Sequence, residues 1–195
     1  MQPGLNSARY FAGGILLFFL VSSCGGPSEP SEIAVRSTGR PVMSSDTSLL
    51  PIPIASILKE MTIKEAAKII TDAKGSPVLL HVYGSWCPPC RFEFPTIIEV
   101  ASRYKAKGLK VVAIALYDNR PDLESMLSEY MLPFPPILIT EESDDVTYAE
   151  MKKLGVRFEG KFPFTAIFDR KGRVVTEWKG VGSMEEFDKV ITPLL

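Results

Sequence analysis

Apolar runs alternate with amphipathic segments from about residue 54 to the C-terminus. The runs at 78–83 and 110–116 have almost no polar interruption, which is typical of strands buried on both faces of a sheet. Residues 63–70 and 94–101 place apolar side chains at i, i+3, i+4 and i+7, the spacing of one helix face. Strands that alternate with helices in this way predict an α/β domain, with a central sheet flanked by helices on both faces.

The second half of the chain adds further elements to this pattern. In order, they are a helix over 121–130, a strand over 137–140, a helix over 146–154, a hairpin of strands 164–169 and 173–178, and a C-terminal helix. Asp169 and Gly172 occupy the positions that a type I turn favours. Because hairpin strands are antiparallel, we expect a mixed sheet. Thr62 and Ser183 each precede a glutamate by three residues, which predicts two helix-starting capping boxes.

The N-terminal part of the chain carries a different pattern. Arg9 precedes a twelve-residue apolar core from Tyr10 to Val21. This core is shorter than the roughly 20 residues of a membrane-spanning helix and suits a secretory signal peptide. The stretch that follows is rich in Ser, Pro, Gly and Thr and predicts a flexible tether. We therefore expect a signal peptide over 1–23, a tether over 24–53 and a folded domain over 54–195.

Composition and charge exclude one class of partner. The chain is 46% hydrophobic with a formal charge of −1, so no nucleic-acid surface is expected. It holds three cysteines and one histidine, and these residue types carry the candidate chemistry.

Cys87 and Cys90 have two residues between them and lie where the strand at 78–83 gives way to a helix. The unpaired N–H groups and the dipole of a helix N-terminus stabilise a thiolate, the form of cysteine that attacks disulfides. A second cysteine one turn later can close a disulfide or resolve a mixed one. This context favours a redox-active pair over a structural disulfide or half of a zinc site. Zinc usually requires four ligands, and the other candidates are His81 and Cys24.

Three segments carry a family resemblance. They are Trp86-Cys87-Pro88-Pro89-Cys90, Cys90-Arg91-Phe92-Glu93-Phe94-Pro95, and Gly155-Val156 followed by Phe162-Pro163. With them, the chain from about residue 55 onward resembles the thioredoxin superfamily, most closely the membrane-tethered TlpA/ResA-type thiol–disulfide oxidoreductases. The helix and strand within 122–140 stand where this branch carries an insertion relative to thioredoxin. The resemblance therefore implies a thioredoxin-like fold with an inserted helix–strand element.

The resemblance also assigns roles within the motif. It implies that Cys87 is the attacking, more exposed cysteine, that Cys90 resolves the mixed disulfide from a more buried position, and that Trp86 covers the pair. Pro88 and Pro89 have no N–H, so two donors that could solvate the Cys87 thiolate are missing. Fewer donors stabilise the reduced form less, so we expect a reductase rather than a strong oxidant.

Pro163 matches the cis-proline of this fold. X–Pro is the peptide bond that reaches cis at low cost. A cis bond would turn the backbone of Phe162 toward the sulfurs, where it could pair with an extended substrate segment. Phe164 departs from the threonine-like residue that often follows this proline, so the details of the groove stay open.

Two titratable residues are candidates for proton transfer. Glu93, one turn beyond Cys90, matches the family's active-site acid, and a partly buried carboxyl with a raised pKa can shuttle a proton to or from a thiol. His81 stands six residues before Cys87, where thioredoxins place a buried aspartate, and could accept the proton of Cys90. The alternatives are a solvent-facing glutamate and a hydrogen-bonded core histidine.

The segment Leu20-Val21-Ser22-Ser23-Cys24-Gly25 resembles the lipobox of bacterial lipoproteins. This resemblance implies that Cys24 is diacylated and becomes the mature N-terminus, with acyl chains that hold the protein on a membrane. The alternatives are an uncleaved anchor and ordinary signal cleavage with an incidental cysteine.

These expectations combine into an exported, lipid-anchored thiol–disulfide oxidoreductase of the bacterial cell envelope, facing the periplasm or the outside, and specifically a reductase. Its substrates would be disulfide-containing envelope proteins, with apocytochrome c as one candidate, and a membrane electron carrier would reduce it again. We expect no cofactor and no resident metal. The alternatives are a copper-binding chaperone or docking module on the same fold, and a disulfide oxidase or isomerase.

Overall fold

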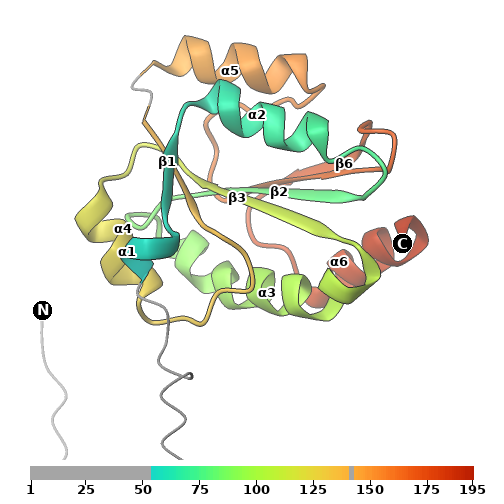
Figure 1. Cartoon of the computed structure of the whole chain (residues 1–195), viewed down its shortest axis with the longest axis horizontal. Coiled ribbons are helices and arrows are strands. Elements are labelled where there is room, and N and C mark those ends of the chain that lie inside the picture. The colour runs from blue at the N-terminus through green and yellow to red at the C-terminus, as the bar shows by residue number, and fades with distance from the viewer. Residues whose placement is uncertain (1–53, 141–142) are drawn as a thin grey trace, which may run out of the picture. The chain divides into compact units, whose positions relative to one another are not determined.

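A mixed six-stranded sheet forms the centre of the domain (Figure 1). The computed structural model describes residues 54–140 and 143–195, so the expected signal peptide, tether and lipidated Cys24 lie outside the described residues. The strands are β1 (Lys59–Met61), β2 (Val78–Tyr83), β3 (Lys110–Ala115), β4 (Ile137–Ile139), β5 (Phe164–Phe168) and β6 (Val174–Lys179). Their order is β1-β4-β3-β2-β5-β6. The strands β1, β4, β3 and β2 are parallel to one another, whereas β5 is antiparallel to its neighbours β2 and β6. This pairing confirms the mixed sheet.

Helices cover both faces of this sheet, with α2 and α5 on one face and α3 and α6 on the other (Figure 1). The helices are α1 (Ile54–Ile57), α2 (Ile63–Asp72), α3 (Pro88–Tyr104), α4 (Arg120–Leu127), α5 (Asp144–Lys153) and α6 (Met184–Ile191), with short 3-10 turns at Lys105–Lys107 and Thr192–Leu194. None of the helices within the described ranges is long and apolar enough to cross a bilayer.

Alternate side chains of β2 enter two separate cores. Leu79 and Tyr83 pack in the cluster that includes α3 and α6, whereas Leu80 and Val82 pack in the cluster that includes α2. Because side chains of a strand alternate between faces, His81 points to the α3 side of the sheet. The fold thus places the single histidine under the helix that begins at the cysteine motif.

The observed elements differ from the predicted ones mainly near the N-terminal end of the domain. Neither α1 nor β1 was predicted, because β1 has three residues, two of them exposed, and shows no apolar alternation. Its pairing with β4, with Lys59 opposite Ile137, holds it in the sheet. The helix α4 ends at Leu127, earlier than expected, because the N–H groups of Glu129 and Tyr130 bond to carbonyls three residues back instead of four. Both predicted capping boxes are confirmed.

Candidate active site

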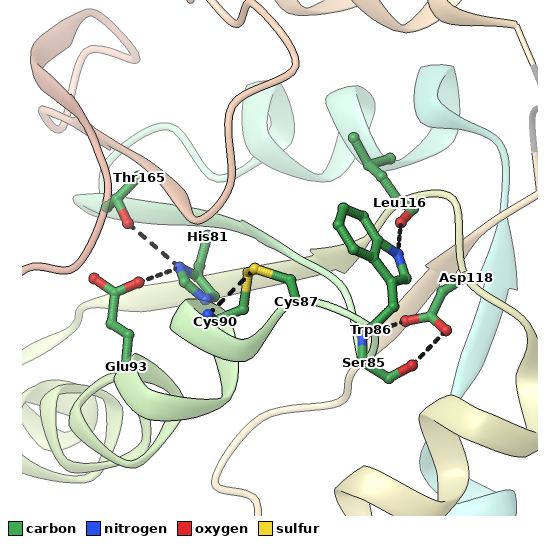
Figure 2. Close-up of a disulfide and its surroundings, with 9 residues drawn as sticks. All are labelled: His81, Ser85, Trp86, Cys87, Cys90, Glu93, Leu116, Asp118 and Thr165. Atoms are coloured by element: carbon green, nitrogen blue, oxygen red, sulfur yellow. Dashed lines mark hydrogen bonds and ion pairs between the residues drawn. A yellow bond between two sulfur atoms is a disulfide. The ribbon is translucent and has the colours of Figure 1, made fainter.

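Cys87 and Cys90 form a disulfide at the N-terminus of α3 (Figure 2). Cys87 is the N-cap, and Pro88 and Pro89 fill the first two helical positions, where a missing N–H costs no helix bond. The N–H of Cys90 donates to Sγ of Cys87 at 3.3 Å. Both residues are buried, with 3% of Cys87 and 0% of Cys90 exposed. Both thiols are thus buried in the oxidised form, and the greater exposure expected for Cys87 stays a prediction.

Asp118 fixes the loop that leads into the motif. Its carboxylate accepts hydrogen bonds from the Ser85 N–H at 2.6 Å, the Ser85 hydroxyl at 2.7 Å and the Asn119 N–H at 2.9 Å. Gly84 allows the loop to close, because a Cβ there would lie 2.5 Å from Nε1 of Trp86. Sequence reasoning missed Asp118. The available signal was that β2 and β3 are parallel neighbours, so the residues just beyond their carboxyl ends meet at one edge of the sheet.

Replacement of Asp118 should loosen this loop and destabilise the protein. In Asp118→Ala, the backbone and hydroxyl donors of Ser85 both lose their acceptor, so we expect a loss of about 1–3 kcal/mol in the free energy of unfolding. Ser85→Ala is the matched control, because it removes only the hydroxyl bond and should cost about 0.5–1.5 kcal/mol. Urea unfolding of the oxidised variants measures both values. Equal losses would contradict the role of Asp118 in holding the backbone.

The loop with the cis-proline lies beside the cysteine motif. The expected cis peptide bond is present between Phe162 and Pro163. The rings of Phe162 and Trp86 meet edge-on, with centroids 5.0 Å apart. Trp86 is half-exposed, and its indole N–H donates to the carbonyl of Leu116 at 3.4 Å. Trp86 and Phe162 thus lie where a docking protein could contact them, and their roles stay predictions.

Two further aromatic residues define this region. Tyr117 is a part-exposed residue with φ of 55°, and its ring lies 6.0 Å from that of Phe162. Sequence reasoning did not single out Tyr117. Phe164 is fully buried and packs on Phe158 at 5.3 Å between centroids. Its bulk therefore fills the core, and it does not narrow the exposed surface beside the cis-proline.

Glu93 is fully buried and does not face solvent. Its Oε1 accepts a hydrogen bond from the Gly182 N–H at 2.6 Å, and its Oε2 lies 3.7 Å from Nδ1 of His81. Burial raises the pKa of Glu93 to about 7, against the opposing effect of the Gly182 bond and with a further contribution from the charge of Glu186. This carboxyl can therefore hold or release a proton near neutral pH.

His81 is also fully buried. Its Nδ1 lies 3.3 Å from Oγ1 of Thr165, and its ring stacks on that of Tyr83 with centroids 5.6 Å apart. Burial lowers the pKa of His81 to about 3. The imidazole is consequently neutral near pH 7, so the expected proton acceptor is weaker than an ordinary histidine.

The two sides of the disulfide differ in character (Figure 2). His81 and Glu93 lie on the side of Cys90, and Trp86 lies on the side of Cys87. Across the residues that the structure describes, no group of three or more His, Cys, Asp or Glu side chains could hold a metal ion. The disulfide therefore has two buried titratable side chains, His81 and Glu93, on one side and the half-exposed ring of Trp86 on the other.

Comparisons with known proteins agree with this chemistry. The sequence model of the Redoxin family matches residues 51–191. Thiol-disulfide oxidoreductase ResA of Bacillus thuringiensis subsp. konkukian (strain 97-27) is 31% identical over 133 residues, which are 66% of this chain and 72% of the relative.

Solved structures show the same fold. A thiol:disulfide interchange protein of the thioredoxin family from Chlorobium tepidum TLS matches with a TM-score of 0.53 and 21% identity, over 63% of this chain and 82% of that one. The exposed lipoprotein thioredoxin Etrx1 of Streptococcus pneumoniae matches with a TM-score of 0.51 and 19% identity, over 64% and 90%. The chain therefore has a thioredoxin-like fold, belongs to the Redoxin family and is a thiol–disulfide oxidoreductase with a Cys87–Cys90 pair.

Proposed function

We propose that the chain is a lipid-anchored reductase of disulfide bonds in bacterial envelope proteins. In the reduced form, the Cys87 thiolate attacks a substrate disulfide, one substrate sulfur leaves as a thiolate, and a mixed disulfide forms. The Cys90 thiolate then attacks Sγ of Cys87, which closes the Cys87–Cys90 disulfide and releases the second substrate sulfur. Two electrons pass from the cysteine pair to the substrate, and the two substrate thiolates take up protons from water.

Glu93 and His81 handle the proton of Cys90 in this cycle. Cys90 loses its proton before it attacks, and a carboxyl with a pKa of about 7 accepts the proton in that step and returns it when the pair is reduced again. His81 stays neutral, and its Nδ1 lies 3.7 Å from Oε2 of Glu93, beside the carboxyl that carries the proton. Their place on the Cys90 side of the disulfide supports this assignment (Figure 2).

The observation that carries the reductase assignment is the pair of prolines at the start of α3. A helix N-terminus normally offers several free N–H groups to an anion, but Pro88 and Pro89 offer none. Among the described residues, the Cys90 N–H donates a hydrogen bond to Sγ of Cys87. Hydrogen bonds that stabilise the Cys87 thiolate favour the reduced form and so make the couple more oxidising. With few such donors, the Cys87–Cys90 couple should have a low reduction potential.

A redox titration tests this assignment. The Cys87–Cys90 couple should have a potential near the value of about −270 mV typical of thioredoxin. Pro89→Ala restores one N–H at the second helical position and should raise the potential by about 30–60 mV, because a bond to a charged group is worth about 1.5–3 kcal/mol. Pro121→Ala, in the first turn of α4, is the matched control and should leave the potential unchanged. A wild-type value near about −120 mV, typical of strong oxidants, would overturn the assignment.

The lipid anchor is supported by the lipobox resemblance around Cys24. Wild-type protein should fractionate with membranes, and Cys24→Ser should move it to the soluble fraction because no acyl chain is attached. Mass spectrometry of the N-terminal peptide checks the modification directly. A Cys24→Ser chain that stays with the membrane would favour an uncleaved anchor.

The proposal requires two kinds of partner. A membrane electron carrier must reduce the Cys87–Cys90 disulfide after each cycle, because each cycle leaves the pair oxidised. The substrates are exported proteins whose disulfides must open, with apocytochrome c as one candidate.

A further inference from the structure

The segment Gly180–Gly182, between β6 and α6, contacts two separate parts of the active site. The Gly180 N–H donates to the carbonyl of Pro163 at 2.8 Å. Two residues later, the Gly182 N–H donates to Oε1 of Glu93 at 2.6 Å, and this bond is buried. One short stretch of backbone is therefore bonded both to the cis-proline beside the cysteine motif and to the buried carboxyl of Glu93.

The two glycines at the ends of this segment are placed by different features. Gly180 has a φ of 92°, a left-handed conformation that favours glycine. At Gly182, a Cβ would lie 2.7 Å from Nε1 of Trp178 and 3.0 Å from Cζ of Phe187, so the backbone is pressed against the core. Ser183 then caps α6 through a capping box. Gly182 is thus closely packed, and Gly180, two residues before it, is bonded to the Pro163 carbonyl, so the two bonds lie at the two ends of one short segment.

Glu93 is the group in this cluster that changes charge near neutral pH. His81 on β2 is neutral there, since burial holds its pKa at about 3, and burial raises the pKa of Tyr83 far above the physiological range. Glu186 on α6 stays ionised because its capping bonds to Ser183 lower its pKa. A carboxylate accepts a stronger and shorter N–H bond than a protonated carboxyl does. The Gly182 bond must therefore tighten when Glu93 loses its proton and relax when it gains one.

We infer that Gly180–Gly182 couples the proton on Glu93 to the position of the cis-proline loop. Ionised Glu93 draws Gly182 inward, and the Gly180 N–H passes this displacement to the Pro163 carbonyl. The backbone that meets the substrate thus senses whether Glu93 has taken up the proton of Cys90. Gly182 is a positioning residue in this scheme. Proton transfer at Glu93 and substrate contact at the cis-proline loop are thereby coupled. The use of this coupling in catalysis rests on the proposed function.

An NMR titration of the oxidised protein without substrate tests the coupling. Between pH 5 and 9, the amide signals of Gly180 and Gly182 should shift with one common midpoint near pH 7, the pKa of Glu93. The amides of Gly75 and Gly108, whose bonds lie in distant turns, should stay constant. A Gly180 signal that does not titrate with Gly182 would overturn the inference. The titration needs no electron donor or substrate, so its outcome is independent of whether the protein proves to be a reductase.

Two variants identify the group that is responsible. Glu93→Gln keeps an oxygen acceptor for Gly182 but cannot ionise, so both signals should become independent of pH. Glu186→Gln removes a charge that raises the pKa of Glu93 while glutamine still completes the capping box, so both midpoints should move to lower pH together. Signals that still titrate in Glu93→Gln, or midpoints that separate in Glu186→Gln, would contradict the coupling.

Discussion

Cys90→Ser should stop the catalytic cycle at the mixed disulfide. The Cys87 thiolate can still attack a substrate disulfide, but no second sulfur is present one turn later to release the product. We expect turnover to fall to the uncatalysed rate and a covalent complex with the substrate to accumulate. Non-reducing electrophoresis followed by mass spectrometry of the trapped species measures both effects, and an envelope fraction as the source identifies the natural substrates.

Cys87→Ser is the matched control for this trap. It should lose turnover and form no covalent complex, because the remaining Cys90 is fully buried. The comparison of the two variants is needed because exposure alone hardly distinguishes the thiols: 3% of Cys87 and 0% of Cys90 is exposed in the oxidised form. Equal trapping by both variants would show that either sulfur can attack, and trapping by Cys87→Ser alone would reverse the assigned roles.

The fold followed from the sequence wherever local pattern and tertiary environment agree. The strand at 78–83 was predicted to the residue, because it is buried on both faces and its apolar run is interrupted only at His81. In contrast, β1 exists through its pairing with β4, which lies far along the chain, and three residues carry no periodicity of their own. Local pattern therefore predicts central strands well and short edge strands poorly.

The candidate site shows the same division. The cysteines and the cis-proline were found from motifs, but the burial of Glu93 was left open, because a glutamate one turn into a helix is as easily placed on the solvent face. Its spacing was a usable signal, since Glu93 stands three residues after Cys90 and four before Ile97, both of which are buried. Asp118 was missed because its partner, Ser85, is reached only through the parallel pairing of β2 and β3.

Removal of Glu93 or His81 should change the pH dependence of stability in opposite directions. The pKa of Glu93 rises from 4.5 to about 7 on folding, so the folded protein holds a proton that the unfolded chain releases between these values. Stability therefore falls by about 3 kcal/mol as the pH rises from 4.5 to 7. The pKa of His81 falls from 6.5 to about 3, so the unfolded chain binds the extra proton and stability rises by about 5 kcal/mol between pH 3 and 6.5.

Between pH 4.5 and 6.5, the effect of Glu93 lowers the stability of the wild-type protein with rising pH and the effect of His81 raises it. Each variant removes one of these two effects, so the other is measured alone. Glu93→Gln should gain stability relative to wild type as the pH rises toward 7, and His81→Asn should lose the rise between pH 3 and 6.5. Urea unfolding of the oxidised proteins at pH 4, 5.5 and 7.5 measures these differences, and any constant cost of the substitution cancels between pH values. Curves parallel to wild type would mean that the two groups titrate at their ordinary values. The buried pair would then be too hydrated to hold a proton for Cys90.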